Sequence, residues 1–210
     1  MNLLFVSLAF LILFLTVEVL NKKIGLKSEY TRKIAHLLSG VIVFFLPYFL
    51  TAYQIISLAA LFTILLIGTR YFGLLSSIHK VNRKTIGEVY FPLGLGLSAF
   101  FFLPQNILAF QFGVLVLAFS DAFGGLVGQL YGKHKIGFGL SKSWEGTLVF
   151  FLTTLVAFLL LVFPSAGKPI LFGVLISAII TIVEGLLSAG LDNLVLPLAS
   201  AFLLNLFIRM

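Results

Sequence analysis

Residues 107–130 read ILAFQFGVLVLAFSDAFGGLVGQL, an apolar run whose only charged member is Asp121. A helix needs about 20 predominantly apolar residues to cross the hydrocarbon core of a bilayer. The run meets that length, and so long an apolar helix is typical of a membrane span rather than of a soluble domain. Residues 107–130 therefore predict a membrane-spanning helix that carries an acid within the bilayer.

The rest of the chain follows the same pattern. Of its 210 residues, 60% are hydrophobic and 10% are charged, whereas a soluble domain carries roughly 25% charged residues. We expect an all-α, polytopic integral membrane bundle of about eight (seven or eight) transmembrane helices, at about 20 residues each, forming a single domain over residues 1–210. The expected spans are 3–20, 34–50, 52–68, 86–103, 107–130, 147–163, 169–187 and 192–208.

The first span is not expected to be a signal peptide, because its lysines follow the apolar run and no cleavage site of small residues is present. Twelve of the 14 Lys and Arg residues lie in the loops 21–33, 69–85 and 131–146. With the turn at 188–192, these loops fall on one face of an eight-span arrangement. The positive-inside rule places that face in the cytosol and the N-terminus outside. Topology thus accounts for the basic charge, and no nucleic-acid partner is expected.

The acidic residues lie on the same side. Six of the seven fall in, beside or within a turn of the loops assigned to the cytosol, and Asp121 lies about 10 residues deeper. Orientation does not require this clustering, because acids contribute little to the positive-inside rule. A shared polar site would require it. The sequence therefore predicts an active site that faces the cytosol.

Asp121 is the strongest individual signal. A carboxylate inside the bilayer costs about 2.5–3.5 kcal/mol on insertion scales, so it needs a partner, a metal ion or a water-filled cavity. Gly124, Gly128 and Gly132 follow at four-residue spacing, on one face of the helix. Small residues at that spacing permit close helix packing, and a bare backbone also permits close approach of a ligand. Both interpretations remain open.

The loop at 131–146 interleaves glycines, lysines and serines just before the next span. Glycines free backbone amides to point at an anion, lysines supply charge, and a helix N-terminus adds its positive dipole end. The alternative is a solvated basic loop attracted to anionic headgroups. The candidate nucleotide-binding residues are Gly124, Gly128, Gly132, Lys133, Lys135, Ser141, Lys142, Ser143 and Gly146.

Other groups suggest a metal ion and a second anion contact. Asp121, Glu184, Asp192 and Asn193 offer hard oxygen ligands of the kind that suits Mg²⁺. The chain has no cysteine and only three scattered histidines, so no zinc set is expected. The start of the second span carries Arg32, Lys33 and His36 on one face; these could bind a phosphate or a substrate headgroup. Two more acids stand at helix starts, Glu88 and Glu145.

Five short motifs follow one another along residues 29–197. They are Arg32–Lys33–x–x–His36, Gly87–Glu88–x–Tyr90–x–Pro92, Asp121–x–x–Gly124–x3–Gly128, Lys142–x–x–Glu145–Gly146 and Glu184–x7–Asp192–Asn193–x3–Pro197. In this order they resemble the dolichol kinase and phytol kinase family, which consists of integral membrane kinases that phosphorylate long isoprenoid alcohols, typically with CTP. By this resemblance, the Lys142–Glu145–Gly146 segment corresponds to the family's nucleotide-binding segment and Asp121 to the acid upstream of it.

The resemblance implies phosphoryl transfer from CTP, with Mg²⁺, to a phytol, geranylgeraniol or dolichol type of alcohol. Asp121, Glu145, Glu88 and Lys142 are then the catalytic candidates, with Glu145 or Glu88 accepting the alcohol proton. One rival is a phosphatidate cytidylyltransferase, which shares the nucleotide segment but carries a His-Gly-Gly run that this chain lacks. The other is a membrane transporter, although no internal repeat of the kind common in transporters is visible. The alcohol, the nucleotide and the oligomeric state are left open.

Overall fold

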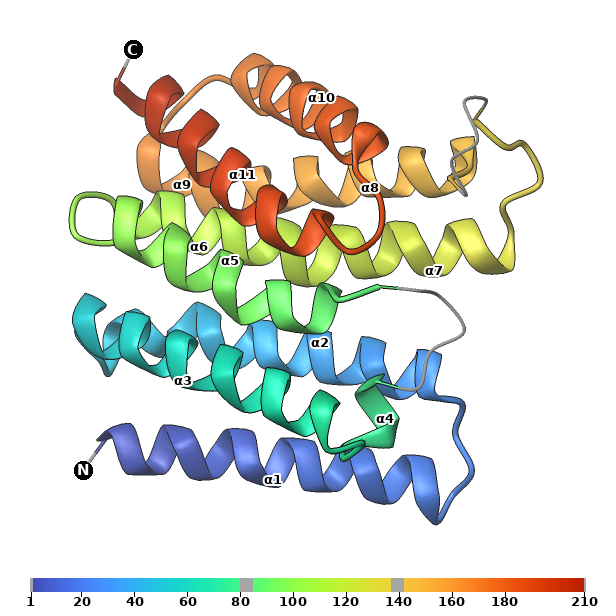
Figure 1. Cartoon of the computed structure of the whole chain (residues 1–210). Coiled ribbons are helices and arrows are strands. Elements are labelled where there is room, and N and C mark those ends of the chain that lie inside the picture. Colours follow the sequence, from blue (N-terminus) through green and yellow to red (C-terminus); the bar gives the residue numbers. More distant parts are fainter. Residues whose placement is uncertain (1, 80–84, 137–141, 210) are drawn as a thin grey trace.

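The computed structural model describes residues 2–79, 85–136 and 142–209, and every named element in these ranges is a helix (Figure 1). The elements are α1 (Asn2–Lys22), α2 (Ser28–Phe45), η1 (Leu46–Tyr48), α3 (Ala52–Tyr71), α4 (Ser76–His79), α5 (Gly87–Phe102), α6 (Ile107–Leu115), η2 (Val116–Asp121), α7 (Ala122–Leu130), α8 (Trp144–Ala157), η3 (Phe158–Val162), α9 (Phe163–Ala166), α10 (Ile170–Leu186) and α11 (Asp192–Arg209).

Each expected span coincides with a helix, and the expectation of an all-helical membrane protein is confirmed. Five helices within the described residues are long and apolar enough to cross a membrane: Leu3–Lys22, Ala52–Tyr71, Ile107–Leu130, Trp144–Ala166 and Asp192–Arg209. Helices α5 and α10 are apolar but shorter. The count of seven or eight spans and the outward N-terminus therefore stay predictions. The short helix α4 was not expected, because its residues fall in a stretch interpreted as a loop.

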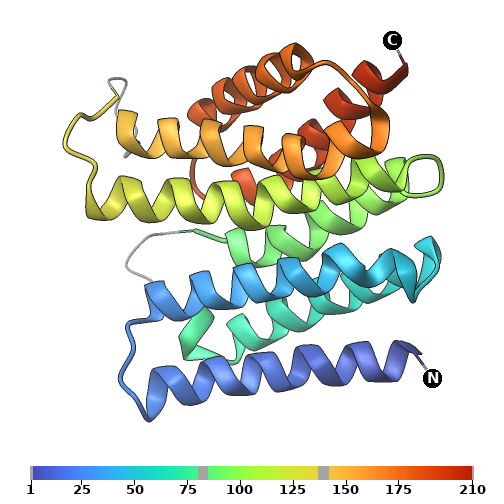
Figure 2. The same ribbon diagram turned by 180° about the vertical axis from the view of Figure 1, so that it is seen from behind.

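The helices run back and forth between two ends of the bundle. Both termini lie at one end, and the connections from α1 to α2, from α7 to α8 and from α10 to α11 lie at the other (Figures 1 and 2). These are the connections that carry basic residues or belong to the C-terminal motif. The arrangement brings the predicted functional segments to a single end of the molecule, which is called here the basic end.

The continuous helix Ile107–Leu130 is the most buried of the five candidate spans. Phe110, Val114 and Leu117 pack into one apolar cluster with α1, α2, α3 and α5. Phe112 and Val116 pack into a second cluster with α8, α10 and α11. The helix therefore joins two halves of the core, and Asp121 stands where this central helix approaches the basic end.

The middle of this helix, η2, is wound as a π-helix. Such wide turns are rare and occur often at functional sites. Here the Leu117 carbonyl accepts a hydrogen bond from His36 Nε2 of α2, at 2.8 Å. The ring of His36 also lies against Phe91 of α5, with 4.5 Å between ring centroids. These contacts hold α2 and α5 against the turn that presents Asp121.

Candidate active site

A cavity of about 780 Å³ lies at the basic end, among α2, α7, α8 and the segment that joins α10 to α11. Residues from four of the five motifs line it, and Thr85, just before the Gly87–Glu88 motif, contributes from the fifth region. The predicted site residues that line the cavity are Arg32, Lys33, His36, Asp121, Gly124, Gly128, Lys135, Lys142, Ser143, Gly146, Glu184, Asp192 and Asn193. Segments more than 150 residues apart in the sequence thus meet around one space.

One wall of the cavity is cationic and comes from α2, which presents Arg32, Lys33 and His36 on the same face. Lys33 Nζ donates to Gln129 Oε1 of α7 at 2.9 Å. The amide of Gln129 in turn donates to Glu29 Oε1 at 2.7 Å. Gln129 and Glu29 line the cavity as well, and sequence analysis singled out neither as part of the site.

The opposite wall carries three carboxylates: Asp121 at the end of η2, Glu184 in the last turn of α10, and Asp192 at the start of α11. Lys142 forms a largely buried ion pair with Glu184 and also donates to its backbone carbonyl. The other oxygen of that carboxylate, Glu184 Oε2, is buried without a hydrogen-bond partner among the described residues. The charges of Asp192, Glu184, Lys142 and Lys33 all act on Asp121, so these groups form one electrostatic unit.

The spaced glycines bring α7 and α8 into close contact. A Cβ added at Gly146 would lie 2.7 Å from the Gly124 carbonyl oxygen and 3.0 Å from Gly128 Cα. Side chains are therefore excluded at this crossing, which is the packing interpretation of the glycine pattern. Gly124, Gly128 and Gly146 also line the cavity. A Cβ at Gly132 would meet the Ser143 side chain at 2.5–2.8 Å, and Gly132 is not among the lining residues.

Of the other predicted site residues, three lie outside the cavity lining and one lies outside the described residues. Glu145 accepts hydrogen bonds from the backbone amides of Lys133 and His134 and from His134 Nδ1, at 2.7–3.3 Å. These bonds fix an exposed turn at the head of α8, and neither Glu145 nor Lys133 lines the cavity. Glu88 is buried beside the cavity rather than in its lining. Ser141 lies outside the described residues.

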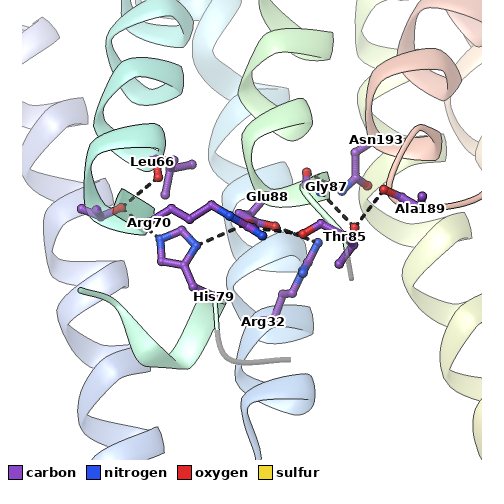
Figure 3. A network of polar contacts seen from close by, with 10 residues as sticks. Arg32, Leu66, Arg70, His79, Thr85, Gly87, Glu88, Ala189 and Asn193 are labelled. Carbon is purple, nitrogen blue, oxygen red and sulfur yellow. Dashed lines mark hydrogen bonds and ion pairs between the residues drawn. The ribbon is translucent and has the colours of Figure 1, made fainter. Parts of the chain in front are cut away.

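Glu88 lies at the centre of a cluster of two arginines and a histidine, drawn in Figure 3. Its carboxylate contacts Arg32 of α2, Arg70 of α3 and His79 of α4. Sequence analysis counted Arg70 as a topology signal and treated His79 as scattered. Tertiary packing, of α3 against α5 and of α4 against α1 and α2, brings them to Glu88, so no short motif could reveal them.

The four expected magnesium ligands differ in how available their oxygens are. The described residues hold no group of three or more His, Cys, Asp or Glu side chains that could bind a metal ion unaided. Glu184 is paired with Lys142. Asn193 Nδ2 donates to the Gly87 carbonyl at 2.7 Å, which leaves Asn193 Oδ1 as an acceptor. Asp121 and Asp192 are the carboxylates of this set that have no ion pair among the described residues, and Mg²⁺ is usually bound by one or two carboxylates together with substrate phosphates and water.

Relatives of the chain decide its family. It is 32% identical to the phytol kinase of Synechocystis over 196 residues, which cover 90% of this chain and 84% of that protein. The chain belongs to the phytol kinase family. It is therefore a kinase, a transferase, and the transporter interpretation is set aside.

Other relatives extend the family. An uncharacterized protein of Methanocaldococcus jannaschii is 31% identical over 186 residues, covering 84% of this chain and 93% of its own. Phytol kinase 1 of Arabidopsis thaliana, a chloroplastic protein, is 27% identical over 154 residues, which cover 67% of this chain and 50% of the plant protein. No family model and no solved structure matches the chain. Family membership thus rests on whole-length similarity to curated proteins.

Proposed function

We propose that this chain transfers the γ-phosphoryl group of CTP to the hydroxyl of a long-chain isoprenoid alcohol of the phytol, geranylgeraniol or dolichol type. The observation that supports it best is one cavity lined by residues of four of the five motifs, with Arg32 and Lys33 on one wall and three carboxylates with Lys142 on the other. Phosphoryl transfer depends mainly on positioning and on stabilising charge, and needs no covalent nucleophile of the protein. The phytol kinases among the relatives support the choice of alcohol.

The nucleotide phosphates would lie between the walls. Lys135 and Lys142 line the cavity beside the start of α8, and Arg32 and Lys33 face them from α2. The amide groups at the N-terminus of α8 add a positive dipole end. Lys142 would exchange its partner Glu184 for a phosphate oxygen, because a lysine binds phosphate as a point charge and needs no fixed geometry.

Asp192 and Asp121, the two carboxylates not paired with Lys142, would have different roles in the reaction. Asp192 Oδ1 accepts from the backbone N–H of Asn193 at 3.0 Å, and Asp192 would hold Mg²⁺ together with the phosphates. The ion would neutralise charge on the transferred group. Asp121 lies deeper along the central helix, on the side from which a membrane-embedded alcohol arrives. It would accept the proton of the attacking hydroxyl, a role that sequence analysis gave to Glu145 or Glu88.

The alcohol would enter from the lipid, with its tail along the apolar helices and its hydroxyl at the cavity. A small apolar cavity of about 50 Å³ among α1, α2, α3 and α5 is lined in part by Phe91, the residue that contacts the His36 ring. Because the positive-inside rule places the basic loops in the cytosol, the protein would be a multi-pass membrane enzyme whose active site faces the cytosol.

Labelled CTP tests the reaction. Purified protein in detergent would receive Mg²⁺, α-labelled CTP and a mixture of phytol, geranylgeraniol and phosphatidate. We expect label in CDP beside an unlabelled phosphorylated alcohol, and EDTA should abolish the reaction. Label carried into the lipid would instead establish cytidylyl transfer. Intact CTP, with ATP and UTP also inert, would contradict the proposal.

Single cysteines test the orientation, because the chain has none of its own. Tyr131→Cys lies at the basic end and Tyr53→Cys at the other, and both native side chains are exposed. In intact bacterial cells, a membrane-impermeant maleimide should label the second variant only. The reverse pattern would place the cavity outside.

A further inference from the structure

Glu88 is the most enclosed acid whose environment is defined by direct ion pairs. Its side chain is 3% exposed, and its contacts come from three other helices. Arg70 Nη1 and His79 Nδ1, the latter at 3.2 Å, both donate to the same oxygen, Glu88 Oε1. The second oxygen, Oε2, lies 3.3 Å from Arg32 Nη2 (Figure 3). A carboxylate so enclosed by the protein is poorly placed to receive a proton from a substrate.

The distribution of charge in this cluster is uneven. A single carboxylate is shared by two guanidinium groups, and arginine stays protonated under all ordinary conditions. Arg70 and His79 contact Oε1, whereas Arg32 forms an ion pair with Oε2, an oxygen that accepts no hydrogen bond from the described residues. The cluster therefore keeps a net positive charge even with Glu88 ionised. Of the two arginines, Arg32 lines the cavity and Arg70 does not, so the surplus charge faces the space proposed for phosphates.

Gly87, next to Glu88, holds Asn193, a second residue of the cavity lining. The Gly87 carbonyl accepts a hydrogen bond from Asn193 Nδ2 at 2.7 Å. A Cβ at Gly87 would lie 2.8 Å from that nitrogen and 2.9 Å from Arg32 Nη2. Thr85 Oγ1 accepts from the Gly87 amide and donates to the Ala189 carbonyl, at 3.0 and 3.1 Å. The start of α5 is thereby tied to the turn before α11, and it contacts both Arg32 and Asn193.

We propose that Glu88 is a positioning residue that holds the Arg32 guanidinium against the cavity for an anionic phosphate group of the substrate. Glu88 aligns Arg32 through Oε2, while Arg70 and His79 compensate the carboxylate so that Arg32 keeps its attraction for an anion. The identity of that anion, a nucleotide phosphate, rests on the proposed function. The positioning role itself rests on the contacts of Glu88 and concerns any phosphate bound in the cavity.

A double-mutant cycle tests this role. Arg32→Gln, Glu88→Gln and the double variant would be compared for kcat, for the KM of CTP and for thermal stabilisation by CTP, which does not require turnover. Arg32→Gln should raise the KM of CTP at least about tenfold, as expected for losing a hydrogen bond between charged groups. Glu88→Gln should raise it by nearly as much. The double variant should match Arg32→Gln alone, because groups that act through one another are non-additive.

Glu18→Gln is the matched control. Glu18 is also an acid near the basic end, with a 14% exposed side chain, an ion pair to Lys22 at 2.9 Å and hydrogen bonds to Ser76 and Ser77. It does not line the cavity, so its loss should leave the KM of CTP unchanged. If the Glu88→Gln variant fails to fold, the Glu88→Asp variant replaces it. Aspartate keeps the negative charge, but its shorter side chain no longer reaches Arg32 in the same position, so the KM of CTP should still rise.

Two results would overturn the proposal. Additive effects of Arg32→Gln and Glu88→Gln on the KM of CTP would show that Glu88 acts independently of Arg32. A fall in the active fraction with an unchanged KM would show a purely structural role. Failure of the proposed function looks different: the wild-type protein would then turn over no alcohol. Thermal stabilisation by CTP or inorganic pyrophosphate that depends on Arg32 and Glu88 would still support the positioning role.

Discussion

The two walls of the cavity differ in how their charged groups are held. On the α2–α5 side, Arg32 is anchored by Glu88, which is itself surrounded by Arg70 and His79. On the α7–α11 side, Glu184 is paired with Lys142, but Asp121 accepts no hydrogen bond from the described residues and Asp192 Oδ1 accepts one from the adjacent backbone N–H of Asn193. A wall whose charges are fixed by the protein is suited to orienting a ligand. A wall on which two carboxylates have no cationic partner among the described residues is suited to reacting with one, so changes there should have the larger effects.

The largest effect should follow Asp121→Asn, on the reactive wall. The substitution keeps the shape of the side chain but removes the charge and the proton acceptor. We expect kcat to fall about 100- to 1,000-fold, the range for removing one catalytic electrostatic group. The protein should still fold, because an uncharged amide is easier to accommodate within a membrane helix. Kinetics at saturating CTP and alcohol, with a melting curve of the same sample, measure both.

Asp192→Asn provides the comparison for Asp121→Asn. If Asp192 holds the ion, its loss should raise the magnesium concentration needed for half-maximal rate, whereas Asp121→Asn should leave that concentration nearly unchanged. Near-normal turnover in Asp121→Asn would contradict its role. Identical magnesium dependence in the two variants would contradict the assignment of metal binding to Asp192 and proton acceptance to Asp121.

The next effect concerns Lys142, the lysine of the reactive wall. Lys142→Met removes the charge and keeps an aliphatic chain of similar length. We expect the KM of CTP to rise about 10- to 100-fold, as for the loss of a charge-assisted hydrogen bond, with the KM of the alcohol unchanged. Lys168→Met is the control, because Lys168 lies in the connection from α9 to α10, at the end of the molecule with the termini (Figure 1), and its Nζ lies 5.9 Å from the centroid of the Phe172 ring. An equal rise in both KM values would show that Lys142 is structural.

A smaller effect, on stability rather than on turnover, should follow Gly146→Ala. The new methyl group would lie 2.7 Å from the Gly124 carbonyl oxygen, so α8 would have to move away from α7. Such overpacking costs about 1–3 kcal/mol and should lower the melting temperature. Gly68→Ala in α3 is the matched control, since a Cβ there meets nothing within 4 Å. Equal melting temperatures for the two variants would show that the α7–α8 contact can relax freely.

Sequence patterns predicted the helices and much of the cavity lining for a physical reason. Apolar runs of membrane-spanning length and loop charges are local signals, and alternation of loops between two ends follows from the number of helices. The motif residues Arg32, Asp121 and Asp192 could therefore be assigned to one end before any packing was known. The π-helical turn at η2 has no comparable local signal, because Val116–Asp121 reads as ordinary apolar helix.

The surroundings of the acids could not be predicted in the same way. Glu88 and Glu145 both stand at helix starts in the sequence, and both were considered as proton acceptors. Glu88 is enclosed by two arginines from α2 and α3 and a histidine from α4, whereas Glu145 holds an exposed turn. Burial and long-range partners depend on how helices pack, and a helix start looks the same in either place. The difference between an acid enclosed by arginines and an acid that holds an exposed turn is thus a tertiary property.

Of the substitutions considered, Glu145→Gln should have the smallest effect on kcat/KM. This result would distinguish Glu145 from Glu88 experimentally. The glutamine would retain an acceptor for the amides of Lys133 and His134, while it loses the charge that faces His134 Nδ1. Exposed ion pairs contribute little because water and salt screen them, so kcat/KM should stay within about fivefold of the wild type. Glu88→Gln, the same chemical change at an enclosed site, should exceed that. A loss of 100-fold or more in Glu145→Gln would instead return Glu145 to the catalytic group and imply that the turn at 131–136 closes over the cavity when CTP binds.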